Sequence, residues 1–165
     1  MPERAMSRSA ADPRAATVRP AFPPRGTVLA FDFGTRRVGV AVGDLETRHA
    51  HPLAVIRTEG AARFAEIGRL MAHWKPDALV VGVPRRDDES PHPLAARAER
   101  FARQLAGRFG LPVARVDESY SSVEAEARLR AAAGARRAIE SARVKALDAH
   151  AAQLLLEQYF AEAAA

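Results

Sequence analysis

The sequence contains no cysteine among its 165 residues. This absence excludes disulfide bonds, thiolate metal sites and a cysteine nucleophile, and it fits a reducing compartment, so we expect a cytoplasmic protein. The chain also lacks any apolar run near the roughly 18 residues of a membrane-spanning helix, so we expect no membrane association. Aromatic residues make up only 6% of the chain, which leaves few rings for stacking on bases.

Lysine is almost absent as well, since Lys75 and Lys145 are the only lysines among 25 basic residues. The net charge is +5, but residues 1–26 contribute +3 of it. A case for a polyanionic partner must therefore rest on local clusters of arginine. The same segment holds five of the 11 prolines and no hydrophobic period. We predict a disordered tail over 1–26 and a single domain over 27–165.

The domain alternates β-branched apolar runs with segments of helical periodicity. The pattern predicts strands at 27–33, 38–44, 51–58, 77–84 and 111–119, and helices at 61–74, 93–110, 121–134 and 143–160. Short turns join the first three strands, which favours antiparallel pairing, whereas helices separate the later ones, which favours parallel pairing. We therefore predict an α/β fold with a mixed five-stranded sheet flanked by helices.

Asp32 interrupts the apolar first strand, "TVLAFDF", just before Gly34. An ionised carboxylate in such a strand is costly unless a partner compensates it, although capping of the following turn is an alternative explanation. Asp117 and Glu118 end the fifth strand, whose carboxyl end should lie beside that of the first. Because adjacent strand residues point to opposite faces, only one of this pair can share a site with Asp32.

Asp148 is the third candidate. It shares a face of the last predicted helix with Ala151, Ala152 and Leu155 and should point toward the sheet, although it would also suit the positive end of the helix dipole. Three inward carboxylates would repel one another unless a cation neutralised them. Oxygen ligands without cysteine or paired histidine suit Mg²⁺ or Mn²⁺, which can assist phosphodiester cleavage.

Five blocks of the sequence together resemble the bacterial YqgF family. They are "LAFDFGTRRVGVAVGD", "ALVVGVP", "PLAARAERFA", "RVDESYSSVEA" and "KALDAHAAQLLLEQYF", and they follow the family's order from about Thr27 to Phe160. The family includes proteins described as Holliday junction resolvases and as the nuclease that matures the 5′ end of pre-16S ribosomal RNA. The resemblance implies a ribonuclease H-like fold, metal-dependent cleavage of structured nucleic acid, and an acidic triad of Asp32, Glu118 and Asp148. Ser119 departs from the arginine usual in the family.

Paired basic residues lie in loops and helix starts that this topology can bring toward the strand ends. We expect them to bind phosphates of RNA or branched DNA, with recognition of backbone and shape. The candidates are Arg36, Arg37, Arg85, Arg86, Arg136, Arg137, Arg143 and Lys145. We expect the protein to act as a monomer or a weak homodimer.

Two other functions fit part of the sequence. The segment "DFGTRRVGVAVGD" is similar to the first phosphate-binding motif of sugar kinases and actin-like ATPases, but those proteins need two such domains and this chain supplies one. A protein that binds RNA or a transcription complex without cleaving is also compatible with Ser119. Cleavage of a precursor RNA with Mg²⁺ or Mn²⁺ would distinguish a nuclease from these two alternatives.

Overall fold

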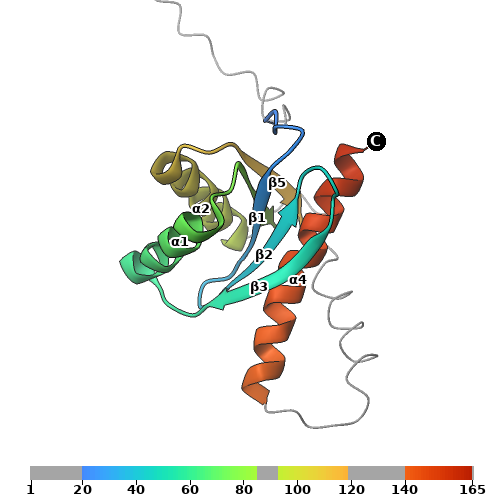
Figure 1. The fold of residues 1–165 in the computed structure, drawn as a ribbon. Helices are drawn as coiled ribbons and strands as arrows, with labels where there is room; N and C mark the ends of the chain where they lie inside the picture. Colours follow the sequence, from blue (N-terminus) through green and yellow to red (C-terminus); the bar gives the residue numbers. More distant parts are fainter. Residues whose placement is uncertain (1–19, 85–92, 119–139, 165) are drawn as a thin grey trace, which may run out of the picture.

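The computed structural model describes residues 20–84, 93–118 and 140–164, with the side chains of 140–147 left out. A single five-stranded sheet occupies the centre, in the order β3-β2-β1-β4-β5 (Figure 1). The strands are β1 (Thr27–Phe33), β2 (Val38–Asp44), β3 (Ala50–Ile56), β4 (Ala78–Val83) and β5 (Val113–Asp117), and the helices are α1 (Gly60–Trp74), α2 (Pro93–Phe109) and α4 (Glu140–Ala163).

The sheet is mixed, as the sequence predicts. β1 pairs antiparallel with β2, and β2 with β3, whereas β1 and β4, and β4 and β5, are parallel. The carboxyl ends of β1, β4 and β5 therefore lie at one end of the sheet. The predicted helix at 121–134 lies outside the described residues.

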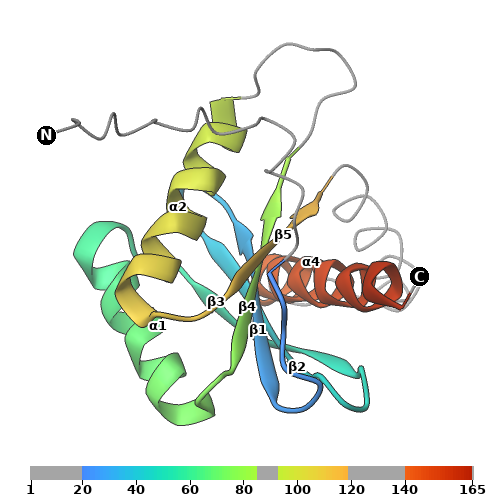
Figure 2. The ribbon, with the colours of Figure 1, turned by 90° about the horizontal axis from the view of Figure 1, so that it is seen from above.

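Helices cover both faces of the sheet (Figure 2). Leu29, Phe31 and Leu79 belong to the core that the sheet shares with α1 and α2. Val28 and Ala30 belong to the core on the other face, where Leu155 and Leu156 of α4 pack. This alternation along β1 fixes the direction of Asp32, which must point to the α4 face.

The helices end largely where the sequence predicts. α2 stops before Gly110, which has a φ of +63° and donates its N–H to Ala106 O over 3.0 Å. The prediction was wrong at the start of α4, which begins at Glu140 rather than Arg143. Asp148 consequently lies more than two turns inside the helix, too far for the dipole of the first turn to stabilise its charge. Among the described residues, no helix is both long and apolar enough to cross a membrane.

Residues 20–26, assigned to the tail on their composition, include a contact with the domain. The Phe22 ring lies 5.0 Å from the Tyr159 ring of α4, measured between centroids. Phe22 and Leu45 both pack against the core on this face. This contact is at the opposite end of the sheet from Asp32. The proposed disorder of residues 1–19 stays a prediction, because they lie outside the described residues.

Candidate active site

Two glycines flank Asp32 in the sheet. Gly39 of β2 and Gly82 of β4 are its partners in register on either side. Asp32 is therefore the central member of a row of three residues across the sheet, and it is the only one of the three with a side chain. Glycine within a strand pattern typically marks the close approach of another part of the chain.

Gly39 makes room for the backbone of α4. A Cβ at position 39 would lie 2.0 Å from the carbonyl oxygen of Asp148. Ala152 is also fully buried, in the core between α4 and the sheet, so a small side chain on the helix accompanies the missing side chain on the strand. Helix α4 can therefore pack closely against the sheet beside Asp32.

Gly82 makes room for Glu118 on the other side of Asp32. A Cβ at position 82 would lie 3.1 Å from the carboxyl carbon of Glu118 and 2.9 Å from Leu155 Cδ2. Glu118 therefore lies on the α4 face, and alternation along the chain directs Asp117 to the other face. The residues alone left these two carboxylates as alternatives, and the structure favours Glu118 as the neighbour of Asp32.

Asp32 and Asp148 interact electrostatically. Burial raises the pKa of Asp32 to about 7, and the negative charge of Asp148 adds to the rise. Burial also raises the pKa of Asp148, although Arg37 and Arg57 act in the opposite direction. Asp148 Oδ2 is buried and accepts no hydrogen bond. Its ion pair with Arg37 Nε, at 3.3 Å, offsets part of its charge.

These features fit a hard divalent cation. The oxygen donors are carboxylates, one of their buried oxygens lacks a hydrogen bond, and the charge on Asp32 is disfavoured at neutral pH. Among the described side chains, no three from His, Cys, Asp and Glu are arranged as a metal-binding group. The structure thus brings Asp148 into electrostatic contact with Asp32. It places Glu118 just after β5, which is not beside β1 as the sequence suggested, because β4 lies between these strands.

The predicted basic residues divide into three groups. Arg36 and Arg37 lie in the turn between β1 and β2, and Arg37 faces Asp148. Arg85, Arg86, Arg136 and Arg137 lie outside the described residues. Arg143 and Lys145 are in α4, but their side chains are not among those described.

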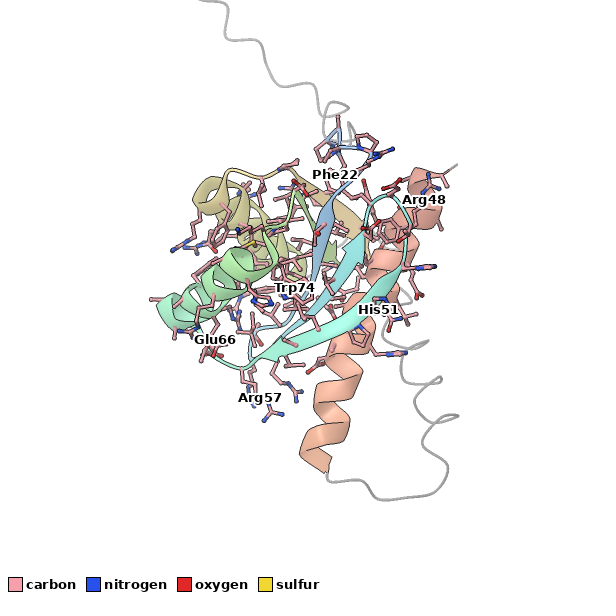
Figure 3. All side chains as sticks on the ribbon, viewed as in Figure 1. Phe22, Arg48, His51, Arg57, Glu66 and Trp74 are labelled. Carbon is pink, nitrogen blue, oxygen red and sulfur yellow. The ribbon has the colours of Figure 1, made fainter. Side chains whose placement is uncertain are left out.

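Two arginines near the site are missing from the sequence-based prediction. Arg57 follows β3 (Figure 3), and its positive charge lowers the pKa of Asp148. Arg63 of α1 is buried and contacts the turn that carries Arg36 and Arg37. Helical periodicity could have predicted that Arg63 is buried, because Arg63 precedes the core residue Ile67 by four positions and so lies on the same face of the helix. Arg57 had no such signal.

Comparison with known proteins assigns the chain to a family. Residues 26–162 match the family model "RuvX: Holliday junction resolvase". A relative from Paraburkholderia phytofirmans, named "Putative pre-16S rRNA nuclease", is 51% identical over 134 residues, covering 81% of this chain and 86% of its own. A relative of the same name from Burkholderia vietnamiensis is 53% identical over 137 residues, covering 82% and 89% respectively.

A solved structure supports the same fold. T. thermophilus RuvC in complex with Holliday junction substrate superimposes with a TM-score of 0.51 at 18% sequence identity, covering 84% of this chain and 96% of that protein. At this identity the likeness concerns the fold, which is the predicted ribonuclease H-like α/β fold. The names of the family model and of the relatives fit a nuclease. The chain belongs to the RuvX (YqgF) family.

Proposed function

We propose that this protein is a cytoplasmic, metal-dependent endonuclease that matures the 5′ end of pre-16S ribosomal RNA. The observation that carries the proposal is the pair of coupled carboxylates, Asp32 and Asp148, at the carboxyl end of the central strand. The name shared by the relatives in Paraburkholderia and Burkholderia supports the RNA substrate. Branched DNA is the alternative substrate, which the description of the family model favours.

Asp32, Glu118 and Asp148 would hold Mg²⁺ or Mn²⁺. When bound there, the cation supplies the Lewis acidity that lowers the pKa of a water molecule and stabilises negative charge on the leaving oxygen. Asp32 contributes a carboxylate fixed by the sheet on both sides. Glu118 approaches over Gly82, and α4 brings Asp148 over Gly39.

Positive charge at the same end of the sheet suits a phosphate backbone. The Arg37 side chain is 45% exposed, so its guanidinium can meet a phosphate from solvent while it remains next to Asp148. Arg36 and Arg57 are exposed on the neighbouring segments. Contacts of this kind orient the backbone without reading its sequence. We infer recognition of a structured nucleic acid by its backbone and shape.

The substitution Asp32→Asn tests the proposal directly. We expect at least about a hundredfold loss in cleavage of a pre-16S leader RNA with Mg²⁺ or Mn²⁺, since loss of a ligand should cost no less than loss of a supporting group. Binding of the RNA should persist. Asp117→Asn is the matched control, because this carboxylate points to the other face, and it should retain cleavage. Full activity of the Asp32→Asn protein would refute the site.

The same assay decides the substrate. The parent protein and the Asp32→Asn variant are incubated with the leader RNA and with a four-way DNA junction at equal concentration. We expect cleavage of the RNA at a defined position and no Asp32-dependent cleavage of the junction. Cleavage of the junction alone would replace the RNA with branched DNA as the substrate and leave the metal site in place.

A further inference from the structure

Arg63 is the one charged side chain that is buried among the described residues, with 6% of its surface exposed. It lies in the first turn of α1, on the face of the sheet opposite Asp32. Burial lowers the pKa of Arg63, while Glu59 acts in the opposite direction. Because a buried charge is costly, its retention in this position calls for a specific set of partners.

The partners of Arg63 come from two separate segments. Its Nε donates to Thr58 O over 2.8 Å, and its Nη2 donates to Thr35 O over 3.0 Å. The guanidinium also lies 5.6 Å from the centroid of the Phe33 ring. An arginine is suited to this arrangement, because its planar group presents several N–H donors in fixed directions and stacks on aromatic rings.

Each of these carbonyl groups belongs to a segment that carries an arginine of the site. Thr35 precedes Arg36 and Arg37 in the turn between β1 and β2, and Thr58 follows Arg57 at the end of β3. Arg37 and Arg57 both act on Asp148. Figure 3 shows Arg57 where the chain passes from β3 to α1, at the end of the sheet opposite Phe22 and Arg48. One buried residue therefore ties the two cationic segments together.

We propose that Arg63 is a positioning residue that holds Arg37 and Arg57 at a fixed separation, so that together they form a two-point clamp for adjacent phosphates beside Asp148. The proposal rests on the proposed function and explains how two of its phosphate contacts are held in place. Two arginines on independent segments would lose conformational freedom whenever the nucleic acid bound. Fixing the segments in advance lowers that cost and strengthens binding without a direct contact from Arg63.

A purely structural role for Arg63 makes a different prediction. If Arg63 only fills the space between α1 and the sheet, its replacement should weaken nucleic-acid binding to the same extent whether or not the two surface arginines are present. If it positions them, its effect should disappear once they are gone. A double-mutant cycle measures this difference.

The experiment measures the affinity of a fluorescein-labelled RNA stem with a single-stranded 5′ extension, in EDTA so that cleavage does not interfere. Arg63→Lys retains the charge but cannot donate in two fixed directions. We expect it to weaken binding at least about threefold and to make the affinity less dependent on salt. The loss should vanish in the background Arg37→Ala/Arg57→Ala. Arg69→Lys, at an exposed position of the same helix, is the control and should change nothing.

The outcomes are decisive in each direction. A loss of binding confined to the background with both arginines supports the clamp. An equal loss in both backgrounds, no loss in either, or an Arg63→Lys protein that does not fold would each overturn it in favour of a structural role. Because the measurement is of binding, it remains informative if Asp32→Asn shows that the protein is not a nuclease.

Discussion

The raised pKa of Asp32 predicts that one substitution will stabilise the metal-free protein while it abolishes activity. Asp32→Asn keeps the shape of the side chain and removes its ionisable group. In the folded protein the pKa of Asp32 is raised to about 7 from an ordinary value of 3.8. Ionisation is therefore harder in the folded state than in the unfolded chain. At a pH above 7 the folded protein contains a carboxylate that destabilises it.

The sign and the size of the effect follow from linkage. Between pH 3.8 and about 7 the folded state keeps a proton that the unfolded state has lost, so stability falls as the pH rises through this range. The full shift corresponds to about 4 kcal/mol. Asp32 is only half-buried by accessible surface, and screening by water reduces the effect, so we expect roughly 2–4 kcal/mol. That is a rise in Tm of roughly 5–15 °C at pH 8.

Urea denaturation in EDTA at pH 4 and pH 8 provides the measurement. The free energy of unfolding of Asp32→Asn should exceed that of the parent at pH 8 and equal it near pH 4. Asp44→Asn is a control of opposite sign, because N–H groups of Glu46 and Thr47 lower the pKa of Asp44. It should destabilise the protein at pH 8. Equal stability of Asp32→Asn and the parent at both pH values would refute the reasoning.

Two further predictions concern packing at the two ends of the sheet. Gly39→Ala places a Cβ against Asp148 O and should lower the free energy of unfolding by about 1–3 kcal/mol or more. Its control, Gly107→Ala in an open position of α2, should raise the free energy of unfolding by about 0.5–1 kcal/mol. Equal effects of the two substitutions in urea denaturation would contradict the close approach of α4. Removal of residues 1–26 should lower the free energy of unfolding by about 1–3 kcal/mol because Phe22 packs against Tyr159. Removal of residues 1–19 should leave Tm unchanged. Equal melting curves for the two truncations would show that the ring contact contributes nothing to stability.

Local patterns were sufficient to predict the sheet. The β-branched apolar runs at 27–33 and 38–44, with a short turn between them, predicted the antiparallel pair, and the helix at 61–74 between two apolar runs predicted a parallel crossover. The start of α4 was wrong because the helix begins at Glu140 and so already contains Ser141, a residue type that favours an N-cap over a helix interior. Composition could not reveal the contact of Phe22 either, since its partner, Tyr159, is distant in the sequence.

The candidate site was less accessible to local reasoning. Asp32 was conspicuous because it interrupts an apolar strand, and the face of Asp148 followed from helical spacing. The choice between Asp117 and Glu118 required the family resemblance, since it depends on the register of β5 against β4. The role of Gly82 depends on the pairing of β4 with β1 and β5, and that of Gly39 on the pairing of β2 with β1 and the packing of α4, so the sequence analysis identified neither glycine.

The protein itself compensates part of the charge on Asp148 but none of the charge on Asp32. Arg37 and Arg57 both favour the ionised form of Asp148, yet burial still raises its pKa. For Asp32, burial and the charge of Asp148 are the causes of the shift, and both raise its pKa. The two arginines therefore offset part of the charge on the helix and leave the carboxylate of the central strand uncompensated. A cation bound between the strands would remove that imbalance, which is why we expect metal binding to depend most strongly on Asp32.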